Sequence, residues 1–132
     1  MRNVKLIEHQ AQECEDWRPG VTTRMLVSAV SGSVQLCIFD QYCQPGHGAP
    51  THFHAVEEVL TVLEGRAEIW VGDDRAEVGA GHSVIVPPGV KHGFRNVSET
   101  DLLHVRATLA APIFEASYED RRELAIRYLP SR

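Results

Sequence analysis

The fold is decided by residues 46–58, which read GHGAPTHFHAVEE. On a β-strand, side chains at positions i and i+2 project from the same face, so His52 and His54 are predicted to point together into a β-structure. A turn or bulge after Ala55 then brings Glu58 back toward the same interior point. Two imidazoles and an anionic carboxylate at one point are typical ligands of a divalent transition metal ion.

A second stretch, residues 81–96, reads GHSVIVPPGVKHGFRN. Its pattern predicts a strand, a tight turn at residues 87–89 and a new strand that begins at His92. Such a hairpin can supply a third imidazole from across a barrel. We therefore predict that His92 completes the ligand set.

Short β-branched or aliphatic runs continue from about residue 21 to residue 108, separated by Gly, Pro, Asp and Asn. Regularly spaced short strands favour an antiparallel sandwich or barrel. Several runs are apolar at successive positions, which predicts strands buried on both faces, one of them under a covering segment or a second subunit. We expect an all-β barrel over residues 21–110 and a homodimer.

The two ends of the chain follow other patterns. Residues 1–20 are predicted to form an N-terminal arm or edge segment, and residues 111–132 a C-terminal helical extension. The run Ser117-Tyr118-Glu119-Asp120 offers an N-cap and an acidic first turn. Aromatic, basic and apolar residues then recur at helical spacing before Pro130: Phe114, Tyr118, Arg121, Ala125 and Leu129. We expect a short amphipathic helix that packs on the barrel or on a partner.

Composition and charge exclude several classes of function. The 132 residues include 13 Lys and Arg against 18 Asp and Glu, a net charge of −5, so nucleic acid is not an expected partner. No apolar run approaches the roughly 20 residues that span a bilayer, and no signal-peptide core is present. We predict one cytoplasmic domain without a membrane partner. The three cysteines form no C-x-x-C motif and are expected to be free thiols: Cys14, Cys37 and Cys43.

The two stretches resemble the two sequence motifs of the cupin superfamily. The first motif, G-x5-H-x-H-x3-E-x6-G, is matched at Gly46, His52, His54, Glu58 and Gly65. The second motif, G-x5-P-x-G-x2-H-x3-N, follows after 15 residues and is matched at Gly81, Pro87, Gly89, His92 and Asn96. All ten motif positions agree, and at residue frequencies of several per cent chance does not produce such a match. The chain resembles a small single-domain cupin, or monocupin, most closely over residues 46–96.

The resemblance implies a jelly-roll barrel, or double-stranded β-helix, with one bound divalent transition metal ion. The ion would be Fe, Mn, Ni, Cu, Co or Zn, held by His52, His54, Glu58 and His92. Three imidazoles and one carboxylate leave two adjacent positions of an octahedral ion for a chelating substrate, or for substrate and dioxygen. We expect a metal-dependent oxygenase, such as a dioxygenase, that acts on a small chelating organic substrate. Glu58 would be its catalytic proton acceptor as well as a ligand.

Two other functions fit the same predicted site. In an isomerase or lyase, the ion would act as a Lewis acid on a carbonyl without a redox change. In a non-catalytic cupin, the pocket would bind a small ligand without turnover. Stand-alone cupins of this size also occur as accessory proteins in polyketide and other biosynthetic clusters, which suggests an aromatic polyketide substrate. Fold and motif do not choose among these functions.

Six further residues on or beside the predicted strands are candidates for the substrate pocket: Arg24, Phe39, Gln41, His47, Phe94 and His104. The two aromatic rings are candidates for apolar walls, and the arginine and glutamine for holding a carboxylate or carbonyl of the substrate. His47 precedes the ligand strand at the mouth of the barrel. The role of His104 depends on which face of its strand lines the interior.

Overall fold

The computed structural model describes residues 4–119 and 121–124 of the chain. The regular elements of this part are strands and two short 3-10 helices, η1 (His9–Ala11) and η2 (Ala29–Ser31). It contains no helix of the length and apolar character that crossing a membrane requires.

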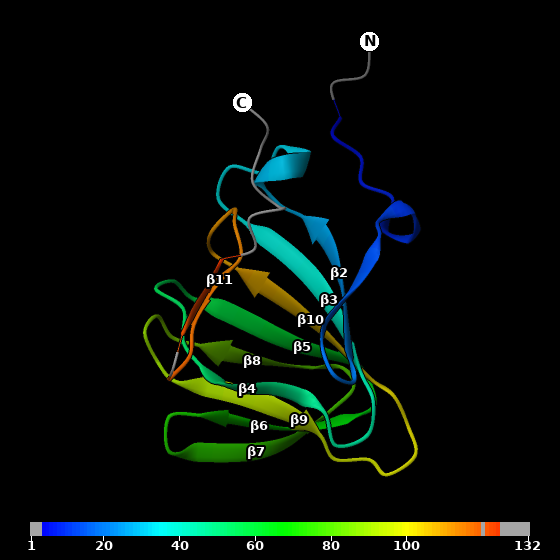
Figure 1. The fold of residues 1–132 in the computed structure, drawn as a ribbon, viewed down its shortest axis with the longest axis vertical. Helices are drawn as coiled ribbons and strands as arrows, with labels where there is room; N and C mark the ends of the chain where they lie inside the picture. Colours follow the sequence, from blue (N-terminus) through cyan, green and yellow to red (C-terminus); the bar gives the residue numbers. More distant parts are fainter. Residues whose placement is uncertain (1–3, 120, 125–132) are drawn as a thin grey trace.

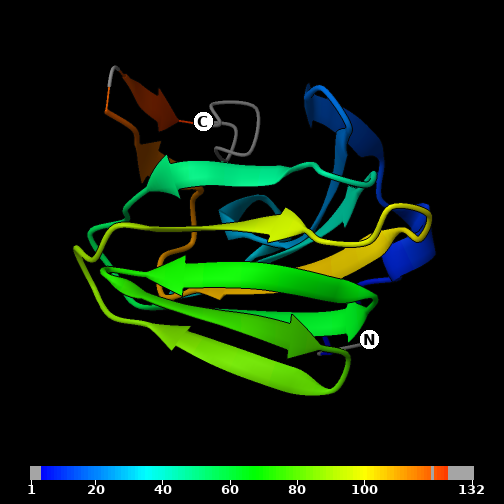
Figure 2. The ribbon, with the colours of Figure 1, turned by 90° about the horizontal axis from the view of Figure 1, so that it is seen from below.

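Two antiparallel sheets face each other and enclose the core (Figure 1). The larger sheet contains, in spatial order, β1 (Cys14–Arg18), β2 (Val21–Val27), β3 (Cys37–Cys43), β10 (Leu103–Leu109), β5 (Glu58–Glu64) and β8 (His82–Val86). The smaller sheet contains β4 (Gly48–His52), β9 (His92–Asn96), β6 (Arg66–Val71) and β7 (Asp74–Gly79). Figure 2 shows the smaller sheet in front of the larger one. The predicted all-β jelly roll is confirmed, and β1, from the predicted N-terminal arm, forms the edge of the larger sheet.

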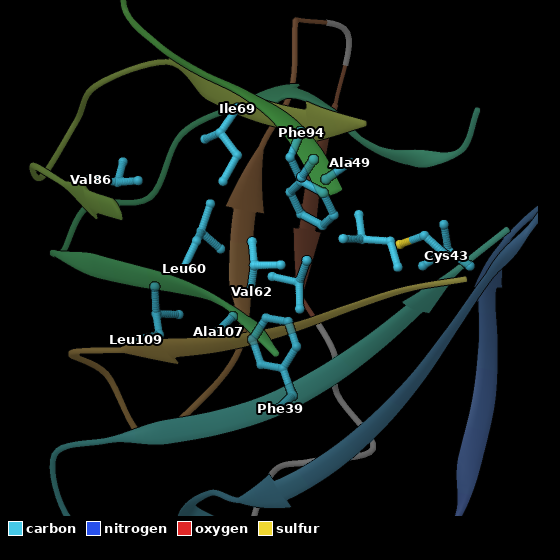
Figure 3. Close-up of a cluster of buried hydrophobic side chains, with 14 of the residues drawn as sticks. Phe39, Cys43, Ala49, Leu60, Val62, Ile69, Val86, Phe94, Ala107 and Leu109 are labelled. Atoms are coloured by element: carbon cyan, nitrogen blue, oxygen red, sulfur yellow. The ribbon is translucent and has the colours of Figure 1, made fainter. Parts of the chain in front are cut away.

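Alternation along the strands divides the side chains between the core and the outer surface. In β10, for example, Leu103, Val105 and Ala107 are buried, whereas the residues between them are only half-buried. Side chains from both sheets point toward one another in the core, as Figure 3 shows for Phe39, Leu60, Val62, Ala107 and Leu109 opposite Ala49, Ile69 and Phe94. Each apolar Å² removed from water contributes about 25 cal/mol, so this core stabilises the frame on which the polar site is built.

Glycine is required at one close backbone approach and favoured at one turn in this part of the fold. A Cβ atom on Gly48 would lie 2.0 Å from the carbonyl oxygen of Phe94, so only glycine permits the pairing of β4 with β9 at this point. The same pairing places His52 opposite His92. In the turn between β1 and β2, Gly20 has a φ of 74°, a left-handed conformation that glycine adopts readily.

The predicted C-terminal helix is wrong where the structure tests it. Residues 115–117 form β11 (Glu115–Ser117), which pairs with β12 (Arg122–Leu124). Ser117, the predicted N-cap, exchanges two backbone hydrogen bonds of 2.9 Å with Phe53, and this tertiary pairing outweighs the local helix signal. Residues 120 and 125–132, which hold the rest of the predicted helix, lie outside the described residues. Figure 2 shows β11 beside the end of β4, where Ser117 forms a bridge with Phe53.

The outer face of the larger sheet carries a row of aliphatic and β-branched side chains in register. The row consists of Ile85, Val59, Thr108, Ile38 and Val27. A second copy of the chain would bury such a row on forming a two-fold dimer. The homodimer stays a prediction, which a measurement of particle mass by light scattering tests.

An ion cluster on the same outer face contributes to stability. Asp40 accepts hydrogen bonds from Arg106 Nε at 2.7 Å and Nη2 at 3.0 Å, and its Oδ2 lies 2.9 Å from His104 Nε2. The ring of His104 stacks on that of Tyr42 with 4.4 Å between centroids. Burial alone would raise the pKa of Asp40, but its contacts with Arg106 and His104 outweigh burial and lower that pKa.

Asp40→Asn is expected to lower the free energy of unfolding at neutral pH by about 1–3 kcal/mol, because Arg106 loses a charged acceptor. The folded-state pKa of Asp40 is depressed, so its contribution is complete above the ordinary pKa of about 3.9 and is lost as pH falls through the folded value. Urea unfolding of both proteins at a series of pH values measures the difference. The two free energies should converge in acid, and a gap independent of pH would contradict this account.

Candidate metal centre

The structure brings all four predicted ligands together at one end of the barrel. His52 ends β4, Glu58 begins β5 and His92 begins β9, while His54 follows β4 directly. A bend at residues 55–56 turns the chain between His54 and Glu58, as the sequence predicted. All four side chains are buried, and one candidate ligand atom from each lies within 4.8 Å of the others. The cluster thus has the composition and spacing of a metal site.

A backbone carbonyl holds each of the three imidazole rings. Nδ1 of His52 lies 2.7 Å from the carbonyl oxygen of Pro50, and Nδ1 of His92 lies 2.9 Å from that of Val90. Nδ1 of His54 contacts the carbonyl oxygen of Glu115. A carbonyl oxygen only accepts hydrogen bonds, so this network assigns the proton of each neutral ring to Nδ1. The Nε2 lone pairs then point toward the cluster, which is the orientation that outer hydrogen-bond partners give to metal-binding histidines.

When the three rings are neutral and protonated at Nδ1, the atoms that face one another across the cluster carry no protons. Glu58 Oε1 lies 2.9 Å from His92 Nε2, and Glu58 Oε2 lies 3.4 Å from His54 Nε2. Among the described residues, His54 Nε2 is one of the buried side-chain atoms without a hydrogen-bond partner. With the Nδ1 protons committed to carbonyls, the Nε2 and carboxylate lone pairs repel unless a proton or cation lies between them. Three neutral imidazoles and one carboxylate fit a divalent transition metal ion.

Burial and mutual contacts set the charges of these groups. Burial alone would raise the pKa of Glu58, but its contacts with His54 and His92 outweigh burial and lower that pKa to about 2. Burial, aided by the nearby His92, lowers the pKa of His52 to about 4. Burial opposes charge on His54 as well, but its contact with Glu58 prevails and raises the pKa of His54. At neutral pH, Glu58 is ionised and His52 is neutral, the states in which both bind metal.

A small cavity opens onto the cluster. Its volume of about 20 Å³ has room for an ion or about one water molecule. Three aromatic rings form part of its wall, those of Phe39, Phe94 and Phe114. Its polar lining beyond the cluster consists of Arg18, Gln41 and Tyr118. Glu58 is the one carboxylate among the described residues that line it.

Three of the six predicted pocket residues line this cavity: Phe39, Gln41 and Phe94. The other three do not: Arg24, His47 and His104. Arg24 and His104 lie on the outer face beside Asp40, because the inward positions of their strands are taken by residues such as Leu103 and Val105. His47 is exposed, and its ring covers Gly20 in the turn after β1.

Sequence reasoning missed several residues of the cavity wall, among them Arg18, Phe114 and Tyr118. Arg18, at the end of β1, donates from Nη2 to Tyr118 Oη at 3.2 Å, across 100 positions of sequence. Phe114 packs against Trp17 with 4.6 Å between ring centroids. All three residues come from the predicted arm and tail. The one local signal was the spacing of Phe114 and Tyr118, which was interpreted as part of a helix.

A double-sheet barrel with three histidines and one glutamate clustered at its end is the arrangement that the two sequence motifs predicted. The family model described as the cupin domain matches residues 39–105, which include all four clustered side chains. The chain therefore belongs to the cupin family.

Relatives and solved structures agree with this assignment. Polyketide synthase CurC of Streptomyces cyaneus is 31% identical over 100 residues, which cover 75% of this chain but 62% of that protein, less than two thirds of its length. An RmlC-like cupin from Shewanella frigidimarina is 25% identical with a TM-score of 0.70, covering 86% of this chain and 91% of that one. The polyketide cyclase RemF from Streptomyces resistomycificus has a TM-score of 0.69, covering 95% of this chain and 85% of that one. Its identity of 21% shows likeness of fold alone.

Replacing His52 and His92 together by alanine is expected to abolish metal binding while the barrel stays folded, because the core does not depend on these rings. Elemental analysis of the untagged protein after anaerobic reconstitution should give about one equivalent of metal per wild-type chain and none for the variant. Circular dichroism checks the fold. His9→Ala with His82→Ala is the matched control, since both of these histidines are exposed. Full metal occupancy in the His52/His92 variant would show that the site is elsewhere.

Proposed function

We propose that this cupin is a metal-dependent enzyme that promotes a non-redox proton transfer on a small chelating substrate, as in an isomerase or a lyase of the cyclase type. The observation that carries the proposal is the position of Glu58, a buried ionised carboxylate that faces an aromatic-walled cavity. The substrate would be a conjugated β-dicarbonyl or catechol-like compound of polyketide type. The 31% identity to Polyketide synthase CurC supports this substrate class.

Different residues of the site would bind the ion and transfer the proton. His52, His54, His92 and Glu58 would hold one divalent transition metal ion. When bound, the ion supplies Lewis acidity, which polarises a carbonyl or hydroxyl and makes a neighbouring proton more acidic. Glu58 would accept that proton and return it to another atom of the substrate, since it is the one carboxylate among the described residues lining the cavity.

The apolar wall performs two further tasks. Its aromatic rings, including Phe39 and Phe94, would offer flat surfaces to a conjugated substrate once the cavity of about 20 Å³ has widened. They also keep bulk water away from the reacting atoms, and contacts between charges are stronger in such a setting. Specific binding and proton transfer thus take place in one enclosed space.

The oxygenase predicted from the sequence is the second candidate function. The donor set favours it as well, because three neutral imidazoles with one carboxylate suit redox-active iron, manganese, nickel and copper. A cupin that binds a small ligand without turnover is the third candidate. The three functions differ in whether dioxygen is consumed and whether a product appears.

Glu58→Gln is expected to lower turnover by about 100-fold or more, because the cavity loses both its proton acceptor and one ligand of the ion. Glu57→Gln, at the exposed neighbouring position, is the matched control and should keep wild-type activity. The assay follows a panel of β-diketones and catechols by mass spectrometry and an oxygen electrode, in air and without oxygen.

The proposed proton transfer gives the same product at the same rate without oxygen. Stoichiometric oxygen uptake would contradict the proposal and support the oxygenase. Tight binding without product would favour the non-catalytic cupin.

A further inference from the structure

The guanidinium of Arg18 carries a charge and N–H donors that the proposed function does not use. Its Nη2 donates to Tyr118 Oη at 3.2 Å and its Nη1 to the carbonyl oxygen of Gly48 at 3.4 Å. Both acceptors are neutral, although a guanidinium carries a full charge and five N–H donors. Glu58, the carboxylate of the same cavity, is already in contact with His54 and His92. A half-buried cation of this kind favours an oxyanion, to which it can donate two hydrogen bonds.

Tyr118 connects Arg18 with the metal centre. The centroid of its ring lies 5.4 Å from that of the His52 ring, while its hydroxyl accepts the hydrogen bond from Arg18. One phenol ring therefore spans the space between the metal centre and the guanidinium.

Tyr118 also separates two hollows. Together with His52 it lines both the small cavity and a second hollow of about 230 Å³, whose other walls include Phe53, Lys91 and Glu119. A ring that turned into the second hollow would join the two spaces.

The backbone around Tyr118 is anchored on both sides. Ser117 pairs with Phe53, and Tyr118 N donates to the carbonyl oxygen of Arg121 at 2.7 Å. Three residues before Tyr118, the backbone carbonyl of Glu115 contacts His54 Nδ1. Rotation of the Tyr118 side chain would open the cavity while these backbone contacts remain, and it would break the ring's contact with Arg121, whose Cζ lies 4.3 Å from the ring centroid.

We infer that Arg18 binds an anionic oxygen of the substrate, and that the substrate takes the space now filled by the Tyr118 ring. The inference rests on the proposed function for the end of the substrate that binds at the metal centre. The substrate class is a flat conjugated molecule with two chelating oxygens at one end. A carboxylate or ionised enol lies about one ring length away and contacts Arg18.

The first experiment measures binding of two probes to the metal-loaded protein by isothermal titration calorimetry. The probes are 3,4-dihydroxybenzoate and its neutral amide, 3,4-dihydroxybenzamide. Wild type should bind the carboxylate about tenfold or more tightly than the amide, as expected for a charge-assisted hydrogen bond. Arg18→Gln should lose this preference while its Kd for the amide stays within about twofold of the wild-type value. Arg66→Gln, which changes an arginine whose side chain is 58% exposed, is the matched control.

The outcomes separate this inference from the proposed function. Equal affinity of wild type for both probes, or equal weakening of both by Arg18→Gln, would overturn the assignment of Arg18 and leave the metal centre intact. Affinities that are the same with and without metal, after treatment with EDTA, would refute chelation at the metal centre. If the preference for the carboxylate still depended on Arg18, the assignment of Arg18 would stand.

Two further measurements test the geometry. In 2,3-dihydroxybenzoate the carboxylate adjoins the chelating oxygens, so Arg18→Gln should change its affinity by less than about twofold. If Arg18→Gln weakened binding of the 2,3-isomer as much as binding of the 3,4-isomer, the anionic group would not lie one ring length from the chelating oxygens. Tyr118→Ala should bind 3,4-dihydroxybenzoate at least as tightly as wild type, because no ring has to be displaced. Loss of binding in this variant, while it stays folded, would contradict the proposal that the substrate displaces the Tyr118 ring.

Discussion

Three imidazole rings donate their Nδ1 protons to backbone carbonyls and gather around one buried, ionised carboxylate, which the Nε2 atoms of His54 and His92 face directly. Placing a charge in a protein interior costs several kcal/mol unless partners compensate it. Here the compensating partners are lone-pair donors themselves, so the cluster is electrostatically complete only with a cation or a proton among its members. The carbonyls fix which chemistry the site can perform, since they leave Nε2 free for a metal ion.

The strands and loops of the barrel hold the three histidine rings in this orientation. The carbonyls of Pro50 and Val90 belong to the segments that deliver His52 and His92, so each ring is oriented by its own stretch of chain. His54 is different, because its carbonyl partner belongs to Glu115 of β11. The chain after the barrel therefore orients one ligand and closes the cavity as well. This dual role makes β11 part of the site rather than an appendage.

The spacing of residues in two short motifs was enough to predict the fold and the clustering of His52, His54, Glu58 and His92. His52 ends β4 and His54 follows two positions later, and alternation along this extended segment brings both rings to the cluster. The substrate wall was harder to predict, because the face of a strand depends on its pairing register. Apolar residues at alternate positions of β10, such as Leu103 and Val105, show in hindsight that His104 faces outward. Arg18 and Tyr118 meet across 100 positions of sequence, and no local pattern reports such a contact.

The most direct test of the central claim is a crystal structure of the zinc-loaded protein with anomalous data collected at the zinc edge. The account predicts one ion per chain, with the Nε2 atoms of His52, His54 and His92 and a carboxylate oxygen of Glu58 at about 2.0–2.2 Å. The Nδ1 atoms should still face their carbonyls. An ion bound through Nδ1, or bound away from these four residues, would contradict it.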